Sequence, residues 1–300
     1  MEPTYTLKKL IEILGKNQFA LLLRIVFDRY PIIIIGDDQS EVDNLLTGIT
    51  SLAPHRHEYI FWSDFIEQDE YIQLCQEEQD DFNVPRIVFS SPPNASKHIF
   101  DKINKLKGWI IGFDKSNGFS KEYIIDAINN IEKQFLIVLT EQNKLKLTLI
   151  GLKNNNFDLT FEKKLIDKAI QKTEVALEKM KRVLKKRIKS TPSNDIMTAI
   201  MRFDMEEEKI RTNIFIQEVQ AFIQAGMRSL AILSRIDLLR ELGFKIELSG
   251  KTLLQTIDYE EVDADRMLQL VQAEYGVDFS PCIRHGRMVQ VGDRIDGFWG

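Results

Sequence analysis

The sequence predicts an α/β fold: a three-layer domain with a mostly parallel sheet, a long basic helix, and a mainly helical second domain with a small β element. Three observations support this prediction. Apolar β-branched runs alternate with segments of helical period up to about residue 160, a heptad-like pattern fills residues 161–190, and residues 191–300 mostly have a helical period. The length of 300 residues, with 44% hydrophobic residues, favours two cores.

The first predicted strand is the run Ile32–Ile35, between Pro31 and Gly36. The run is β-branched throughout and apolar on both faces, which is typical of a central parallel strand. Two amphipathic helices are predicted before it, at Leu7–Leu14 and Gln18–Asp28. Further strands are predicted at Glu58–Trp62, Arg86–Ser90, Trp109–Phe113, Phe135–Thr140 and Lys146–Leu152, with helices at Glu41–Leu52, Asp64–Gln79, Asn94–Leu106 and Ser120–Glu132. This alternation predicts right-handed crossovers and a sheet covered on both faces.

A boundary is predicted in the Asn-rich stretch Lys153–Leu159, so that domain 1 covers residues 1–160. The long helix Thr160–Lys189 then carries a heptad seam. Its positions are Ile166, Ile170, Thr173, Leu177, Met180 and Leu184. Such a seam can pack on a helix of the same chain or join two copies of the chain in a homo-oligomer.

Domain 2, residues 191–300, is predicted to be mostly helical. The first helix starts at Thr191 or Ser193 and ends at Gly226. A helix at Ser229–Leu242, a strand at Phe244–Leu248, a helix at Glu260–Tyr275 closed by Gly276, and a hairpin at Val277–Val291 turning at His285 and Gly286 follow.

Composition excludes several classes of protein. Cys75 and Cys282 lie far apart and match no metal or redox spacing, which favours a reducing compartment. The segment MEPTYTLKKLIEILGK has no cleavage signal and the longest apolar runs are of about five residues, so we expect a cytoplasmic protein without a membrane span. His55 and His57 have no further ligand at metal spacing, so we expect no metal site.

The connection after Ile35 is the place where a phosphate-binding loop would lie. Such a loop needs GxxxxGK[ST], because backbone amides cradle the phosphates, the lysine neutralises charge and the hydroxyl holds magnesium. Here Gly36 is followed by Asp37, Asp38, Gln39, Ser40, Glu41, Val42 and Asp43. The second glycine, the lysine and the hydroxyl are replaced, and four carboxylates oppose a polyphosphate.

The order of elements between residues 30 and 152 resembles a degenerate P-loop NTPase-like domain that lacks the Walker lysine. Trp109–Asp114 ends in an acid at the place of a metal-orienting aspartate. Phe135–Gln142 ends in the polar residues Thr140, Glu141 and Gln142, like the neighbouring strand of that family. The resemblance implies that Gly36, Asp37, Ser40 and Asp114 would be the cofactor-binding residues, although we expect no cofactor. An unrelated three-layer α/β domain remains an alternative.

Two other motifs are less specific. Phe19–Leu52, a helix feeding a buried strand and then an acidic loop and helix, is similar to the central part of DENN-type domains, which act on small GTPases. Gly250, Lys251 and Thr252 match the last three residues of the phosphate-loop motif. The first glycine of that motif would have to be at position 245, which is Lys245. We therefore interpret this GKT as a chance match.

Charge is unevenly distributed. Residues 161–190 hold 11 basic and 4 acidic side chains, whereas residues 1–160 hold 17 and 23 and residues 191–300 hold 12 and 18. Seven of the cations, Lys179, Lys181, Arg182, Lys185, Lys186, Arg187 and Lys189, lie at the end of the long helix. They can satisfy the helix dipole and contact the acidic domains, or they can bind nucleic acid, anionic lipid or an acidic protein, although no aromatic residue is interleaved to stack a base.

Near the C-terminus, Phe298 and Trp299 either pack back on domain 2 or present an aromatic anchor to a partner. Together these patterns favour a scaffold or regulatory protein-interaction module without catalysis. One alternative is a nucleotide-binding enzyme or sensor with an atypical phosphate site, built from the loops after Gly36, Ser90 and Phe113. The other is a nucleic-acid-binding protein that uses residues 179–189.

Overall fold

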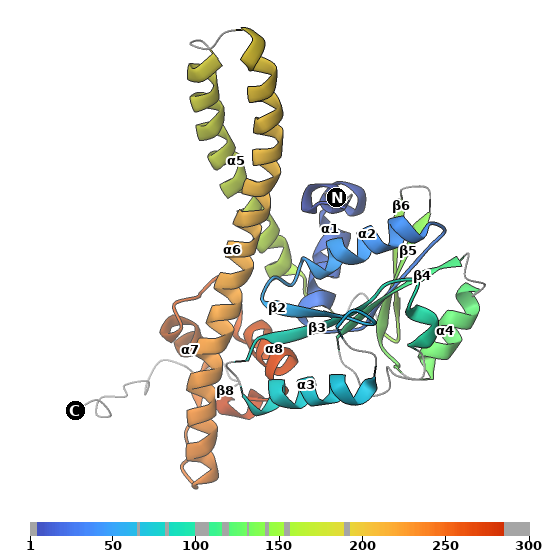
Figure 1. Cartoon of the computed structure of the whole chain (residues 1–300). Helices are drawn as coiled ribbons and strands as arrows, with labels where there is room; N and C mark the ends of the chain where they lie inside the picture. The colour runs from blue at the N-terminus through green and yellow to red at the C-terminus, as the bar shows by residue number, and fades with distance from the viewer. Residues whose placement is uncertain are drawn as a thin grey trace. The chain divides into compact units, whose positions relative to one another are not determined.

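The computed structural model shows a mixed α/β protein (Figure 1). It describes residues 5–64, 67–81, 84–99, 108–115, 120–130, 132–141, 144–152, 157–188 and 193–284. The chain divides into two compact units, residues 1–221 and 222–300. The sequence predicts boundaries near residues 160 and 190 instead, and these remain a prediction about independently folding domains.

The first unit is built on a six-stranded sheet with the order β2-β3-β4-β1-β5-β6. The strands are β1 (Ile32–Gly36), β2 (Arg56–Ile60), β3 (Arg86–Ser91), β4 (Trp109–Asp114), β5 (Phe135–Glu141) and β6 (Lys144–Ile150). The first five run parallel and β6 runs antiparallel to β5, so the prediction of a mostly parallel sheet is confirmed. β6 is antiparallel because only two residues separate it from β5, which is too few for a crossover.

Helices cover both faces of the sheet (Figure 1). α1 (Leu7–Phe27) and α2 (Gln39–Thr50) lie on one face, and α3 (Gln68–Asp80) and α4 (Lys121–Asn129) lie on the other. α1 is two helical segments joined at Gly15, whose φ of 66° is easy only for glycine, and these segments match the two predicted helices. Every residue of β1, β3 and β4 is buried, as expected for strands covered on both sides.

Element ends differ from the prediction where side chains cap the backbone. β2 lies two residues earlier than predicted. α3 begins at Gln68 rather than Asp64, because Asp64 turns back to accept from the Ile60 amide and Glu67 forms a capping box with Glu70. Within the predicted helix Asn94–Leu106, the described residues form only a short 3-10 turn, Ser96–His98, and residues 100–107 lie outside the described residues.

The long helices α5 (Thr160–Ile188) and α6 (Ser193–Glu241) come next. Lys168 and Lys172 of α5 both pair with Glu218 of α6, and Thr173 lines the same small hollow as Arg211. Residue numbers therefore rise along α5 as they fall along α6, so α5 and residues 193–221 of α6 form an antiparallel helical hairpin (Figure 1).

The prediction that a helix ends at Gly226 is wrong, because α6 continues through this residue to Glu241. The side chain of Leu270 packs close to Gly226, since a Cβ on this glycine would lie 2.9 Å from Cδ2 of Leu270. The predicted strand Phe244–Leu248 is also wrong, since the chain is irregular until β7 (Leu248–Ser249).

The rest of the second unit consists of α7 (Gly250–Thr256), α8 (Ala264–Tyr275) and β8 (Ile283–Arg284), which pairs in parallel with β7. α8 starts later than predicted because Asp263 caps it by accepting from the Arg266 amide, and Gly276 ends it with a φ of 74°, as predicted. The predicted hairpin Val277–Val291 is wrong for its first residues, which form a 3-10 turn at Ser280–Cys282, and residues 285–300 lie outside the described residues.

Candidate functional site at the carboxyl ends of the strands

The parallel strands of the first unit end at one edge of the sheet, where ligands bind in open α/β sheets. After β1 the chain crosses through α2 to β2 at the far edge, whereas after β4 it crosses through α4 to β5 on the other side of β1. The helices of these two crossovers lie on opposite faces of the sheet (Figure 1). The resulting switch point lies beyond Gly36, Asp114 and Glu141, the last residues of β1, β4 and β5. We call this place the crevice.

Two of the predicted cofactor-binding residues are neighbours here, because Gly36 and Asp114 are paired in the register of β1 and β4. Asp37 follows directly and is exposed, whereas Asp114 is only 4% exposed. Ser40 lies in the exposed first turn of α2, where its carbonyl accepts from the Asn44 side chain at 2.7 Å. A cofactor-binding role for these four residues remains a prediction.

The connection between β1 and α2 is too short for a phosphate cradle. β1 ends at Gly36 and α2 begins at Gln39, so only two residues link them. A phosphate loop instead places four residues between its two glycines, and their amides wrap the anion. The helix is also close to the sheet, since a Cβ on Gly36 would lie 2.5 Å from Cγ2 of Thr140 and 2.6 Å from Cγ2 of Val42.

The amide end of α2 is occupied by one of the chain's own carboxylates. Asp38 is the N-cap residue, and its Oδ1 accepts from the Ser40 amide at 3.0 Å. A helix N-terminus binds anions through such amides. Here the anion is already supplied by the protein.

A second carboxylate, that of Glu41, is held between two hydroxyl groups. Its Oε1 accepts from the Tyr5 hydroxyl at 2.5 Å and from Thr140 Oγ1 at 2.6 Å. Tyr5 is only 2% exposed, and its burial together with the hydrogen bond to Glu41 raises the pKa of Tyr5 to about 12. The segment before α1, the first turn of α2 and the end of β5 are thus joined at one oxygen atom.

A lysine also lies at the crevice, beside two acids. Lys115, the residue after β4, lies 2.9 Å from Oδ1 of Asp37 and 3.5 Å from Oε1 of Glu141. The hydrogen bond to Asp37 and the charges of both acids raise the pKa of Lys115. Lys115 thus lies beside two carboxylates, both of them largely exposed.

An open hollow of about 490 Å³ adjoins the crevice. Its lining combines two acids, two lysines and two leucines: Asp37, Glu141, Lys144, Lys146, Leu139 and Leu145. Small-molecule sites are mostly apolar, with few and convergent polar groups. The mixed charges of this hollow do not converge on one ligand chemistry.

The other predicted site residues lie on α5 or beyond the described part of the chain. Lys181, Arg182 and Lys185 are exposed on α5. Lys186 and Arg187 are in α5, but their side chains lie outside the described residues, as do Lys189 and Trp299 entirely. Lys251 is an exposed residue of α7, whose first amides are capped by Ser249, so the GKT motif forms no strand-to-helix phosphate loop.

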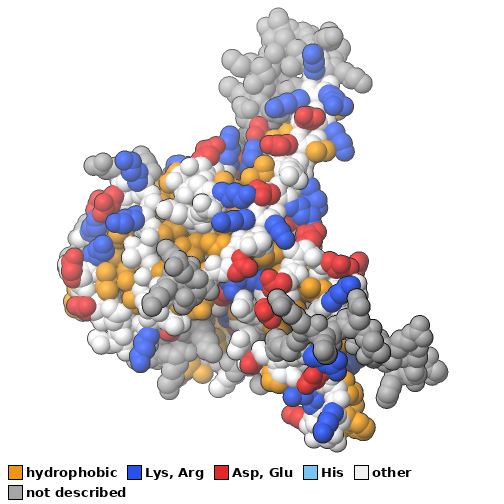
Figure 2. Space-filling view, turned by 180° about the vertical axis from the view of Figure 1, so that it is seen from behind, with side chains coloured by type: hydrophobic (Ala, Val, Ile, Leu, Met, Phe, Trp, Pro, Cys, Tyr) orange, Lys and Arg blue, Asp and Glu red, His pale blue; other side chains and the backbone are white. Residues whose placement is uncertain are grey.

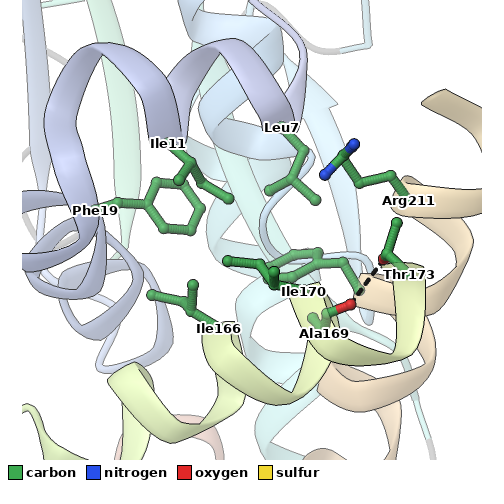
Figure 3. Close-up of a pocket in the computed structure, with 9 residues that line it drawn as sticks. Leu7, Ile11, Phe19, Ile166, Ala169, Ile170, Thr173 and Arg211 are labelled. Carbon is green, nitrogen blue, oxygen red and sulfur yellow. Dashed lines mark hydrogen bonds between the residues drawn. The ribbon is translucent and has the colours of Figure 1, made fainter. Parts of the chain in front are cut away.

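Three positions of the heptad seam are buried within the chain, and Ile170 and Met180 are half-buried. Ile166, Thr173 and Leu177 are between 1% and 7% exposed. The seam encloses a hollow of about 20 Å³ with side chains of α1 and α6 (Figure 3). This volume has room for about one water molecule, so the seam offers no cavity for a ligand. A homo-oligomer formed through the seam remains a prediction.

Sequence reasoning missed Tyr5 and Lys115. Lys115 could have been found, because residues directly after parallel strands converge at one edge of the sheet. Nothing in the sequence relates Tyr5 to a helix that starts 34 residues later.

Searches for a metal site and for a membrane span are negative. Within the described ranges, no group of three or more His, Cys, Asp or Glu side chains could hold a metal ion. Among the helices that the structure describes, none is long and apolar enough to cross a membrane.

Comparison of the chain with protein-family models, with curated proteins and with solved structures finds no match.

Proposed function

We propose that this chain is a non-catalytic scaffold or regulatory module that binds another protein, with an α/β unit that no longer has a phosphate site. The observation that carries the proposal is the position of Glu41, whose carboxylate is held by Tyr5 and Thr140 in the first turn of α2. In a phosphate-binding loop this region supplies donors and a lysine. Here an acid stands in this region instead, and it accepts from two hydroxyl groups of the chain.

Charge supports the same conclusion. A polyphosphate in the crevice would lie near the carboxylates of Asp37, Asp38 and Glu41, and Lys115 already pairs with two acids. Two like charges about 4 Å apart repel by about 1 kcal/mol in water and about 4 kcal/mol near a protein surface. Several such contacts would outweigh the few donors that remain.

A surface of the second unit supports a protein partner. Leu238, Leu242 and Phe244, at the end of α6 and just after it, are 56%, 66% and 57% exposed. We call these three residues the apolar patch. Large apolar side chains that stay exposed near one another are typical of protein contact sites. Both cysteines are free thiols, which suits a reducing compartment.

The alternative is a nucleotide-binding enzyme or sensor with an atypical phosphate site. One observation favours it: Lys144 and Lys146 line the open hollow beside the crevice. A ligand there would contact these lysines rather than the amides of α2.

Thermal unfolding with Mg·ATP, Mg·GTP and the two diphosphates separates the two functions. A ligand at a hundred times its dissociation constant adds about 2.7 kcal/mol to the free energy of unfolding. We expect no concentration-dependent rise in Tm and no phosphate release above a blank. A saturable rise in Tm, or turnover, would remove the scaffold proposal.

The protein-binding part needs its own test. A variant with Leu238→Ser, Leu242→Ser and Phe244→Ser should lose partners that the intact chain captures from cell extract. The control is Val175→Ser on α5, a single apolar side chain that is 55% exposed. Equal capture by the patch variant and the control would contradict a role for the apolar patch.

A further inference from the structure

We propose that the outer face of α5 between Lys179 and Lys185 binds the phosphate backbone of double-stranded nucleic acid, without sequence preference. This surface uses none of the crevice residues and none of the apolar patch. It therefore goes beyond the proposed function and can fail or hold independently of it.

Four cations lie within seven residues of α5, and all are exposed: Lys179, Lys181, Arg182 and Lys185. Figure 2 shows Lys and Arg side chains gathered along this part of the helical hairpin. Arg182 lies 3.7 Å from Glu178, but the two side chains are 79% and 71% exposed. Such an exposed pair contributes little and leaves the guanidinium accessible. Among the described residues, Lys179, Lys181 and Lys185 have no ion pair.

Two lysines nearer the start of α5 differ from those of the outer face, because they pair with an acid of α6. Lys168 lies 2.9 Å from Oε2 of Glu218, and Lys172 pairs with Oε1 of the same carboxylate. Glu218 is only 5% exposed, so both lysines neutralise a buried acid of α6. No described acid does the same for the lysines of the outer face.

The helix dipole accounts for only part of the run. Its effect is confined to about the last turn of a helix, and α5 ends at Ile188. Lys185 is within that turn, whereas Lys179, Lys181 and Arg182 lie before it. The position of these three cations therefore needs another explanation, and a polyanionic partner provides it.

The geometry favours a nucleic-acid duplex over a lipid surface. A helix that lies on a membrane inserts its apolar face, but the apolar face of α5, with Leu165, Ile166 and Leu177, is buried inside the first unit. The exposed face has no aromatic side chain between Lys179 and Lys185 on which single-stranded bases could stack. At 1.5 Å per residue the four cations span about 9 Å, close to the axial distance of about 10 Å covered by four successive phosphates on one strand of a duplex.

The test is fluorescence polarisation of the full chain with a labelled duplex of mixed sequence, over a range of KCl concentrations. If about four phosphates are neutralised, the slope of log K against log[salt] is about −3.6. The variant Lys179→Glu, Arg182→Glu and Lys185→Glu should bind at least tenfold more weakly at low salt and flatten the slope by about 2.7.

A charge-matched control separates this surface from net charge. Arg235, Lys245 and Lys251 are exposed cations of the second unit. Their replacement by glutamate changes the net charge equally and should leave most of the affinity. Circular dichroism melts of both variants check that the chain is folded.

Four results would overturn the proposal. These are no binding by the intact chain at low salt, equal loss in the two variants, tighter binding to the single strand than to the duplex, and binding to phosphatidylserine vesicles without binding to the duplex. The expected pattern is duplex binding that depends on salt and on α5.

Discussion

Replacing Tyr5 by phenylalanine would remove one hydroxyl group from the hydrogen bonds that close the crevice. Tyr5 is 2% exposed and donates to Oε1 of Glu41 at 2.5 Å, and the same oxygen accepts from Thr140. A hydrogen bond to a charged group contributes about 1.5–3 kcal/mol. Because Glu41 keeps Thr140 as a donor, we expect Tyr5→Phe to lower the free energy of unfolding by about 1.5 kcal/mol at neutral pH.

The effect of Tyr5→Phe on the free energy of unfolding should depend on pH. The pKa of Tyr5 in the folded chain is raised to about 12, whereas a tyrosine in an unfolded chain titrates near 10. The folded state therefore holds this proton more tightly, so its contribution is complete below pH 10 and is lost as the pH rises toward 12. The difference in unfolding free energy between the intact chain and Tyr5→Phe should be constant up to about pH 9 and then shrink as the pH rises toward 12.

Urea denaturation followed by circular dichroism measures this difference at several pH values. The variants Tyr5→Phe and Glu41→Ala and their double variant form a cycle whose coupling energy isolates the contact. The control is Tyr123→Phe, at a position that is 54% exposed. Additive single effects, or a difference that grows as the pH rises above 10, would refute the contact between Tyr5 and Glu41.

Three other substitutions test contacts within the first unit. Arg56→Met removes guanidinium bonds of 2.7 and 3.0 Å to the last carbonyls of α1, and we expect a loss of about 2–3 kcal/mol by urea denaturation. Glu78→Ala removes the buried carboxylate that binds Arg29 at 2.6 and 3.2 Å, with an expected loss of about 3–5 kcal/mol by the same method. Gly36→Ala places a Cβ within 2.6 Å of two side chains, so calorimetry should show a lower Tm, equivalent to about 1–3 kcal/mol. An unchanged midpoint in any of these variants would contradict the corresponding contact.

The sheet could be predicted because its strands carry a strong local signal. Ile32–Ile35 is β-branched and apolar on both faces, and the structure buries all of it in the centre of the sheet. Trp109, at the start of β4, and Phe135, at the start of β5, are fully buried in the same way. The order of the strands does not follow from any local pattern, because it depends on crossovers that join β1 to the far edge.

The errors occurred where tertiary packing outweighs local preference. Gly226 has the residue type that ends helices, but α6 continues through it, and the glycine leaves room for the side chain of Leu270. α7 was missed because its seven residues, capped by Ser249, are too short for a clear period.

The sequence alone predicts the negative charge of the candidate site, but it does not predict which side chains contact one another there. The four carboxylates after Gly36 are visible in the sequence, and the prediction that they disfavour phosphate rests on them alone. Which donors hold Glu41 depends on Tyr5 and Thr140, which are 36 and 99 residues away. Such long-range partners are determined by the fold, and a single sequence carries no signal for them.

The proposal that the crevice binds no phosphate is tested most directly by NMR. The backbone amides of Gly36 and Ser40 would report on an anion bound after β1, in a ¹⁵N-labelled chain titrated with Mg·ATP. We predict that neither resonance moves, because Asp38 already accepts from the Ser40 amide and the carboxylates after Gly36 repel a phosphate. A saturable shift of both amides, reversed by chelation of magnesium, would contradict the account.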